Sequence, residues 1–290
     1  MQTPVGISVI TCSKDPNWLR RCHAAIANTT KGLHETVVVD NSAGQYSLAQ
    51  AYNIGVERAK YDMLVFIHED CLMVTSLWDE MIQDIFYCWP HVKIIGVAGA
   101  TLLPESGCWW QAGRPYIRGR VVHFDTIRQW MSHYSVPREY GVVNVVAVDG
   151  LFMAVRKSLM GGGKLFDEER FKGFHFYDLD LSASVSSKEK GAMVITHAIT
   201  VAHAATANMT EWEKYRQVFV EKYKGALPLM EQGVAPGMTT GGWEVHEVPH
   251  NAKVIPPWFL QLRADWARSI AEGKTPQPQE MHPLAKPIAP

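Results

Sequence analysis

The sequence predicts an α/β fold in which a mostly parallel, mixed sheet carries helices on both faces. Three observations support this prediction. Short β-branched runs alternate with amphipathic helical segments through the first half of the chain. The strand runs are continuously apolar, as in strands buried on both faces. Polar residues directly follow the first three strand runs, where open α/β sheets bind their ligands.

The first half of the chain divides into alternating strands and helices. Ser47 and Ser76 are expected to cap the second and third helices, because serine oxygens accept hydrogen bonds from the free amides of a first helical turn. Strands are expected at residues 6–11, 35–39, 63–67 and 93–98, and helices at residues 18–28, 48–59 and 77–89.

The second half is less regular. Residues 104–139 lose periodicity and gather Gly, Pro, Trp and Arg, which indicates irregular structure lining a site. Residues 174–181 are expected to lead into a polar helix that ends near residues 190–191, and a loop carrying His197 and His203 follows a short strand. Strands are expected at residues 142–148, 151–155 and 193–196, and helices from Thr210 and between Pro257 and Glu272.

The 290 residues suit one large domain with an appendage. We expect a domain over residues 1–225, made of halves 1–100 and 101–225. Residues 226–290 are expected to form a C-terminal extension with one amphipathic helix, packed on the main domain or on another subunit. Its proline-rich tail beyond Gly273 is expected to be disordered or to lie on a neighbour. The sequence leaves a homo-oligomer open.

Composition excludes several classes of protein. A formal charge of -1 gives no basic field, so nucleic acid is not an expected partner. The 5 cysteines include no Cys-x-x-Cys pair, which argues against a disulfide framework and a cysteine-rich zinc site. The sequence shows neither a signal-like start nor an apolar run near the roughly 20 residues of a membrane span. We expect a soluble, cytoplasmic protein; peripheral contact with a membrane stays open.

Three polar clusters follow the first three strands, and they indicate a nucleotide site. A diphosphate requires a cation, and hard carboxylate oxygens hold Mg²⁺ or Mn²⁺. Asp40-Asn41-Ser42 also fits a simple turn, because these residue types favour turns for local reasons. Three consecutive ionisable groups after a buried strand favour a metal or phosphate role more strongly. The clusters are Thr11-Cys12-Ser13, Asp40-Asn41-Ser42 and His68-Glu69-Asp70.

These residues resemble a known family. Four motifs in this order look like the nucleotide-sugar-binding half of family 2 glycosyltransferases, which have the Rossmann-like GT-A fold. They are the first two clusters, then Asn53-Ile54-Gly55 on a helix, and then Phe66-Ile67-His68-Glu69-Asp70. Residues 148–156 and 174–182 are similar to the acceptor-side motifs of its bacterial members. The resemblance covers roughly Ile7 to Tyr223.

The resemblance implies transfer of a sugar from a nucleotide diphosphate donor with the help of Mn²⁺ or Mg²⁺. Asp70 would be a metal ligand, and His203 would reach the metal or the diphosphate, with His197 as its rival. Most members carry Asp where His68 stands, so the first position of the usual Asp-x-Asp motif is altered. The donor-binding residues would be Thr11, Ser13, Asp40, Asn41, Asn53, His68 and Glu69.

The resemblance also implies that Asp178 is the catalytic base of an inverting reaction, while Tyr177 takes the place of a usual glutamate. Helix capping is the alternative for Asp178 and Asp180. The acceptor would be a glycan or lipid-linked glycan, in bacterial surface polysaccharide synthesis. Its contacts would be Trp109, Trp110, Asp149 and Asp180, with Arg114 and Tyr116 completing an aromatic and cationic wall; packing explains the tryptophans equally well.

Two other functions stay open at this point. The first is a catalytically inactive carbohydrate- or partner-binding module, which stays possible because His68 replaces the usual first Asp of the motif. A nucleotidyltransferase normally has a glycine-rich phosphate loop after its first strand, and Ser13-Lys14-Asp15-Pro16 lacks one. The catalytic interpretation requires that the acidic groups after residue 67 and those before the polar helix face each other across one cleft.

Overall fold

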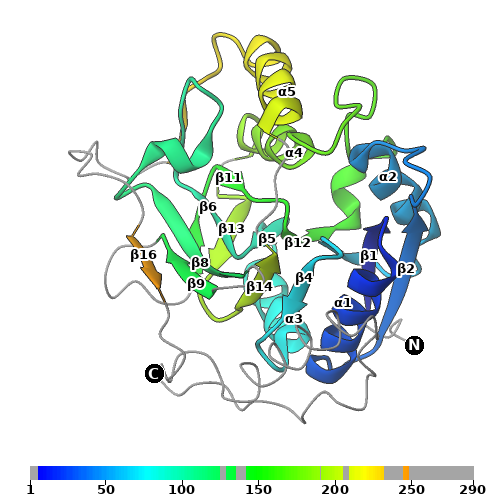
Figure 1. Ribbon diagram of the computed structural model, residues 1–290. Coiled ribbons are helices and arrows are strands. Elements are labelled where there is room, and N and C mark those ends of the chain that lie inside the picture. The colour runs from blue at the N-terminus through cyan, green and yellow to red at the C-terminus, as the bar shows by residue number, and fades with distance from the viewer. Residues whose placement is uncertain are drawn as a thin grey trace.

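The computed structural model describes residues 6–124, 129–134, 142–189, 191–204, 209–231 and 244–247 of the chain. Two sheets dominate these residues, with helices on both sides of the first (Figure 1). The fold is a mixed α/β architecture, as the sequence predicts.

The central sheet has seven strands in the order β10-β13-β5-β12-β3-β1-β2. Five of these strands run in one direction, whereas β12 and β10 are antiparallel to their neighbours, so the sheet is mixed and mostly parallel. The strands are β1 (Ile7–Ser13), β2 (His34–Asp40), β3 (Met63–Ile67), β5 (Ile94–Gly96), β10 (Val142–Asn144), β12 (Phe152–Arg156) and β13 (Met193–Thr196).

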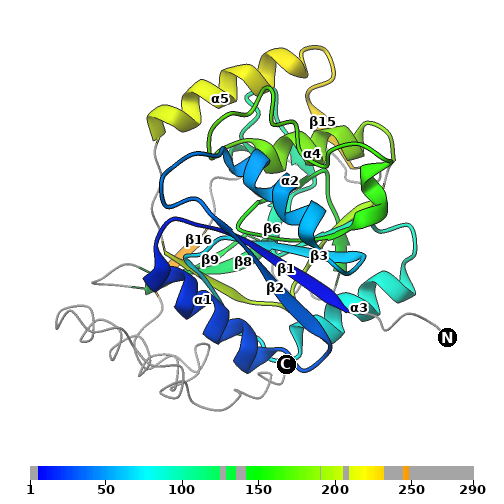
Figure 2. The ribbon, with the colours of Figure 1, turned by 90° about the vertical axis from the view of Figure 1, so that its right-hand side faces the viewer.

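The two faces of this sheet are covered by different helices, as Figure 2 shows. Side chains alternate along each strand: Val65 and Ile67 of β3 pack with α1 and α3, whereas Leu64 and Phe66 pack with α2 and α4. This alternation is why continuously apolar strands are required here. The helices are α1 (Pro16–Thr29), α2 (Leu48–Arg58), α3 (Trp78–Cys88), α4 (Tyr177–Ser186) and α5 (Met209–Lys222).

A second sheet lies beside the first, in the order β11-β6-β8-β14-β4, with β9 paired to β8 and β16 to β9. The pair β7 (Leu102–Leu103) and β15 (Leu229–Met230), and the 3₁₀ helices η1 (Trp109–Ala112) and η2 (Lys157–Met160), complete the described elements. The strands are β4 (Cys71–Met73), β6 (Ala98–Ala100), β8 (Ile117–Phe124), β9 (Gln129–His133), β11 (Ala147–Val148), β14 (Val201–Ala204) and β16 (Glu244–Glu247).

This second sheet corrects three sequence predictions. Residues 104–139 contain β8 and β9 where irregular structure was expected, and His203 lies on β14 where a loop was expected. The runs 93–98 and 142–148 are not single strands, since each crosses from the central sheet to the second one. Such pairings are non-local. The pairing of β6 with β8 requires glycine at position 119, because a Cβ there would lie 2.0 Å from the Val97 carbonyl oxygen.

One of the two predicted helix caps is confirmed. Ser47 Oγ accepts a hydrogen bond from the Gln50 amide at the start of α2. The prediction for Ser76 is wrong, because α3 begins after Leu77 in the left-handed conformation and has no side-chain cap. Asp79 instead accepts hydrogen bonds from the amides of Lys31 and Gly32, so a tertiary contact replaces the local one.

The predicted C-terminal helix between Pro257 and Glu272 and the tail after it lie outside the described residues. None of the helices in the described part of the chain combines the length and apolar character that a bilayer span requires.

Candidate active site

A cleft of about 780 Å³ opens beyond the carboxyl ends of β1 and β3. Its wall includes the turn after β3, the turn after β11, the start of α4 and the start of α5. Asp70 and Asp178 both line it, so the two acidic groups named from the sequence face one cavity. The lining residues that carry polar chemistry are Lys14, His68, Glu69, Asp70, Asp149, His175, Asp178, His203 and Glu211.

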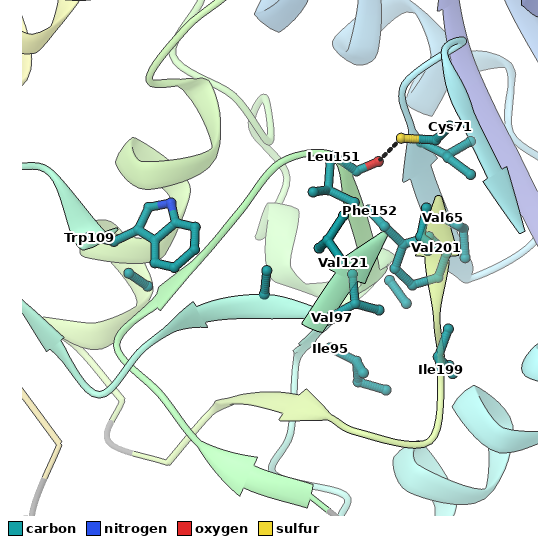
Figure 3. Packing of buried hydrophobic residues seen from close by; sticks show 14 of the residues in the cluster. Val65, Cys71, Ile95, Val97, Trp109, Val121, Leu151, Phe152, Ile199 and Val201 are labelled. Atoms are coloured by element: carbon teal, nitrogen blue, oxygen red, sulfur yellow. Dashed lines mark hydrogen bonds between the residues drawn. The ribbon is translucent and has the colours of Figure 1, made fainter. Parts of the chain in front are cut away.

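Backbone contacts explain why these turns meet. The carbonyl oxygen of Leu151 accepts hydrogen bonds from the His68 amide at 3.2 Å and from Cys71 Sγ at 3.6 Å. Figure 3 shows the Cys71 contact among side chains of the buried hydrophobic core. The turn that carries Asp70 is therefore tied to the turn that carries Asp149 and Gly150.

His68, Asp70 and His203 form a group that could hold a metal ion. One donor atom from each lies within 4.8 Å of the others. The register of β14 against β4 produces this arrangement, since His203 pairs with Cys71 and the Ala204 amide donates to the Asp70 carbonyl oxygen. His203 Nε2 lies 3.6 Å from Asp70 Oδ1. Two imidazoles and a carboxylate suit a divalent transition metal such as Mn²⁺.

The surroundings of His68 favour a neutral imidazole, the form that binds metals. Burial lowers the pKa of His68, although the Asp70 carboxylate opposes the shift. The neighbouring His123, whose ring centroid lies 5.7 Å from that of His203, has its pKa lowered to about 4 by burial. His203 Nδ1 is buried and has no hydrogen-bond partner among the described residues. A buried ring nitrogen without a hydrogen-bond partner is consistent with a role as a ligand.

Tyr177 joins the metal-binding side of the cleft to the Gly150 turn. Its hydroxyl lies 2.8 Å from His68 Nε2 and donates to the Gly150 carbonyl oxygen at 3.0 Å. Gly150 must be glycine here, because a Cβ would lie 2.1 Å from that hydroxyl oxygen.

Asp178 lines the same cleft from the first turn of α4. Its Oδ2 accepts a hydrogen bond from the Gly150 amide at 2.8 Å. Burial raises the pKa of Asp178 to about 7, and the Asp149 carboxylate, which also lines the cleft, adds to the rise. A carboxyl group tuned to this range can remove a proton near neutral pH.

The residue before α4 has strained backbone geometry. Phe176 has φ of 68°, in the left-handed region that disfavours a bulky side chain. Its buried ring packs on Trp212 and Phe219 of α5, with ring centroids 5.3 Å away in each case. The packing with α5 therefore holds the strained residue that sets the direction of Tyr177 and Asp178.

The structure places the predicted donor residues in varied surroundings. Glu69 lines the cleft and accepts hydrogen bonds from Ser13 Oγ and from the Lys14 and Asp15 amides, which fixes the turn between β1 and α1. Thr11 is buried and does not line the cleft. Asp40 is exposed on the strand edge, and its carboxylate accepts from the Ser42 amide.

Two asparagines predicted to bind the donor instead make tertiary contacts within the protein. Asn41 is buried and bonds both the amide and the carbonyl oxygen of Tyr46. Asn53 bonds both backbone groups of Phe166 and the Glu168 carboxylate, so it ties α2 to residues 166–168. Neither lines the cleft.

The predicted acceptor residues divide into two groups. Trp109, Trp110 and Asp149 line the cleft. Asp180 lies outside it: Oδ1 binds Lys222 Nζ at 2.6 Å and the Tyr223 hydroxyl at 2.9 Å, which ties α4 to the end of α5. Arg114, Tyr116 and His197 also lie outside the cleft lining.

Several lining residues were not singled out from the sequence. Lys14 Nζ stands 3.9 Å from the ring centroid of Phe174, and His175 Nε2 lies 3.8 Å from Glu211 Oε2. Trp212 of α5 packs on Trp110, with ring centroids 5.2 Å apart. The sequence places Trp212 on an apolar helical stripe, but no sequence signal shows that this helix begins at the cleft.

Comparison with known proteins adds a family and a fold. A family model described as a glycosyltransferase-like family matches residues 8–223. A search of curated proteins returns no match to this chain. The fold is similar to that in the crystal structure of GalNAc-T7 with UDP, GalNAc and Mn²⁺, with a TM-score of 0.51 and 12% identity over 73% of this chain and 46% of that one. This chain thus spans less than half of GalNAc-T7.

A weaker likeness is to A197 from STIV, with a TM-score of 0.42 and 12% identity over 69% of this chain and 86% of that one.

Proposed function

This chain belongs to the glycosyltransferase-like family and has the GT-A fold, and from that premise we propose that it transfers a sugar from a nucleotide diphosphate donor to a hydroxyl acceptor, with a divalent metal at the site. One observation carries the proposal: a group able to hold a metal and a carboxyl with a raised pKa line the same cleft.

His68, Asp70 and His203 would hold the metal, which we propose to be Mn²⁺ or Mg²⁺. The nitrogen ligands favour Mn²⁺ of the two, since Mg²⁺ prefers oxygen ligands in an octahedral arrangement. A cation held there supplies charge neutralisation for the departing nucleoside diphosphate. Glu69 fixes the turn between β1 and α1 through its hydrogen bonds to Ser13 and Lys14. We propose that the donor lies next to this turn.

Asp178 is the proposed base. The Gly150 amide holds its Oδ2, and the carboxylate would accept the proton of the acceptor hydroxyl. Direct attack by that hydroxyl at the anomeric carbon would invert the configuration of the transferred sugar. The Asp149 carboxylate favours proton uptake, because two nearby negative charges repel each other.

The donor and the acceptor are proposed on different grounds. GalNAc-T7 was crystallised with UDP, GalNAc and Mn²⁺, and this supports a nucleotide-sugar donor. Trp110 and Trp212 present aromatic surface to the cleft, which suits stacking with a sugar ring of a glycan or lipid-linked glycan acceptor. Synthesis of a bacterial surface polysaccharide is the setting we propose.

The test is turnover of nucleotide sugars by the purified protein. We expect release of nucleoside diphosphate from one member of a panel of nucleotide sugars, with and without simple glycoside acceptors. The release should require Mn²⁺ or Mg²⁺ and should stop with excess chelator. Donor binding without any turnover in all metals would instead support an inactive binding module.

A further inference from the structure

We propose that Tyr177 is a positioning residue that fixes the tautomer of His68, so that Nε2 of His68 carries the proton and Nδ1 keeps the lone pair for the metal. The inference rests on the proposed metal site and goes beyond it, because it assigns a role to the residue that stands where the resembling family has a glutamate.

A count of protons carries the argument. The Gly150 carbonyl oxygen has no proton, so its 3.0 Å contact with the Tyr177 hydroxyl is a hydrogen bond only if the tyrosine donates. A hydroxyl has one proton, and it is then used. The 2.8 Å contact between the same oxygen and His68 Nε2 therefore requires that the histidine donates.

The opposite arrangement is disfavoured by burial. If Tyr177 donated to His68 instead, two oxygen lone pairs would face each other at the Gly150 carbonyl. Tyr177 is 3% exposed, so water has little access to relieve that contact. A buried acceptor that loses its donor keeps its full desolvation cost without a compensating hydrogen bond, and this cost selects one tautomer.

The position of Tyr177 is itself firmly set. Its ring packs between Tyr52 and Phe166, with ring centroids 5.4 and 5.7 Å away. The absence of a side chain at Gly150 leaves room for the hydroxyl, and the left-handed Phe176 directs the chain into α4. A glutamate could accept the same proton from His68, but its second oxygen would repel the Gly150 carbonyl oxygen. Tyrosine fits because it both accepts and donates.

The consequence is a metal ligand prepared in the correct form. A histidine ligand commonly donates its second N–H to a neighbouring oxygen, and loss of that partner typically weakens metal affinity by about 10–100-fold. The hydroxyl of Tyr177 is that partner here. It also donates to the carbonyl oxygen of Gly150, whose own amide holds Asp178, so one residue, Gly150, connects the metal ligand to the proposed base.

The first test needs no metal. Long-range ¹H–¹⁵N spectra of metal-free protein with labelled histidine report which ring nitrogen carries the proton, and His68→Gln assigns the signal among the 12 histidines. We expect His68 with the proton on Nε2 in the wild type and a mixture of tautomers in Tyr177→Phe. A wild-type His68 with its proton on Nδ1, or an unchanged spectrum in Tyr177→Phe, would overturn the proposal.

The second test measures Mn²⁺ affinity by calorimetry. Tyr177→Phe keeps the ring and should weaken binding by about 10–100-fold. Tyr215→Phe removes a hydroxyl from another buried ring, which does not line the cleft, and should bind Mn²⁺ as the wild type does. Equal affinity in Tyr177→Phe and wild type would overturn the role of Tyr177 and leave the metal site standing. A wild type that binds no Mn²⁺ would overturn the metal site, and the spectra alone would then decide the tautomer.

Discussion

At the scale of single residues, the carboxyl of Asp178 is the proposed base. It has one oxygen held by the Gly150 amide and lines the same cleft as the proposed metal ligands. General-base catalysis typically contributes about 10²–10⁴-fold, so Asp178→Asn should reduce kcat by about that factor. Donor affinity, measured by calorimetry, should be unchanged because Asn keeps the shape of the side chain.

The matched control for this variant is Asp180→Asn. Asp180 lies on the same helix, but its carboxylate binds Lys222 outside the cleft. We expect the control to lower thermal stability and to keep kcat near that of the wild type. Near-normal transfer by Asp178→Asn would contradict the assignment of the base.

The pKa of Asp178 predicts the pH dependence of the reaction. The base acts only when deprotonated, and its pKa is raised to about 7. The value of kcat/KM should therefore rise about tenfold per pH unit below that pKa and level off above it. A profile measured at saturating Mn²⁺ checks this. A profile that is flat from pH 5 to pH 8 would contradict it.

The same shift predicts how stability changes with pH. Because the pKa is higher in the folded state than in an unfolded chain, where Asp titrates near about 3.9, the folded state binds more protons between these values. This stabilising contribution is complete below the unfolded pKa and is lost as the pH rises through about 7. The Tm gain of Asp178→Asn over the wild type, measured by calorimetry without metal, should therefore grow from pH 5 to pH 8. A gain that shrinks over this range would contradict the raised pKa.

Asp70 gives the corresponding prediction for the metal. A ligand that binds only the folded state raises the free energy of unfolding by about 2.7 kcal/mol at a hundredfold excess over Kd, and Tm rises with its concentration. Mn²⁺ should raise the Tm of the wild type and have little effect on Asp70→Ala. Glu69→Gln offers a comparison, because Glu69 lies beside Asp70 but binds the β1–α1 turn. An equal Mn²⁺ response in Asp70→Ala would exclude Asp70 as a ligand.

At the scale of elements, the junction before α4 stores backbone strain that packing with α5 maintains. Replacing a buried Phe by Ala typically costs about 3–5 kcal/mol, so Phe176→Ala should be strongly destabilised. Phe176→Gly loses the same ring but tolerates the left-handed backbone, which costs other residues about 1–2 kcal/mol. The glycine variant should therefore be the more stable of the two in urea denaturation. The reverse order would mean that the left-handed conformation is not retained.

Elements with local signals were predictable from the sequence. The apolar runs and the Ser47 cap identified the central strands and α2, because these features depend on neighbours in the chain. Strand β8 was not predicted, since its arginines and Gly119 conceal a strand that is defined only by distant partners. For the same reason the runs that change sheets were taken as single strands.

At the scale of the whole molecule, the second sheet completes the site. It carries His203 on β14, beside the turn that carries Asp70, while the central sheet and α4 supply His68 and Asp178. The sequence named these four residues from motifs. It could not show that three other predicted site residues lie away from the cleft. A polar side chain can face a ligand or another part of the chain, and only tertiary contacts decide which. These contacts join Asp180 to Lys222, Asn41 to Tyr46 and Asn53 to Phe166.

The central claim is that one cleft holds both the metal and the base. The most direct measurement is an anomalous difference map at the manganese edge from a crystal soaked with Mn²⁺ and UDP. We predict a peak bounded by His68, Asp70 and His203, with the cleft in front of it closed by Asp178. A map with no peak at these residues, or with manganese and UDP bound at another surface, would contradict the account.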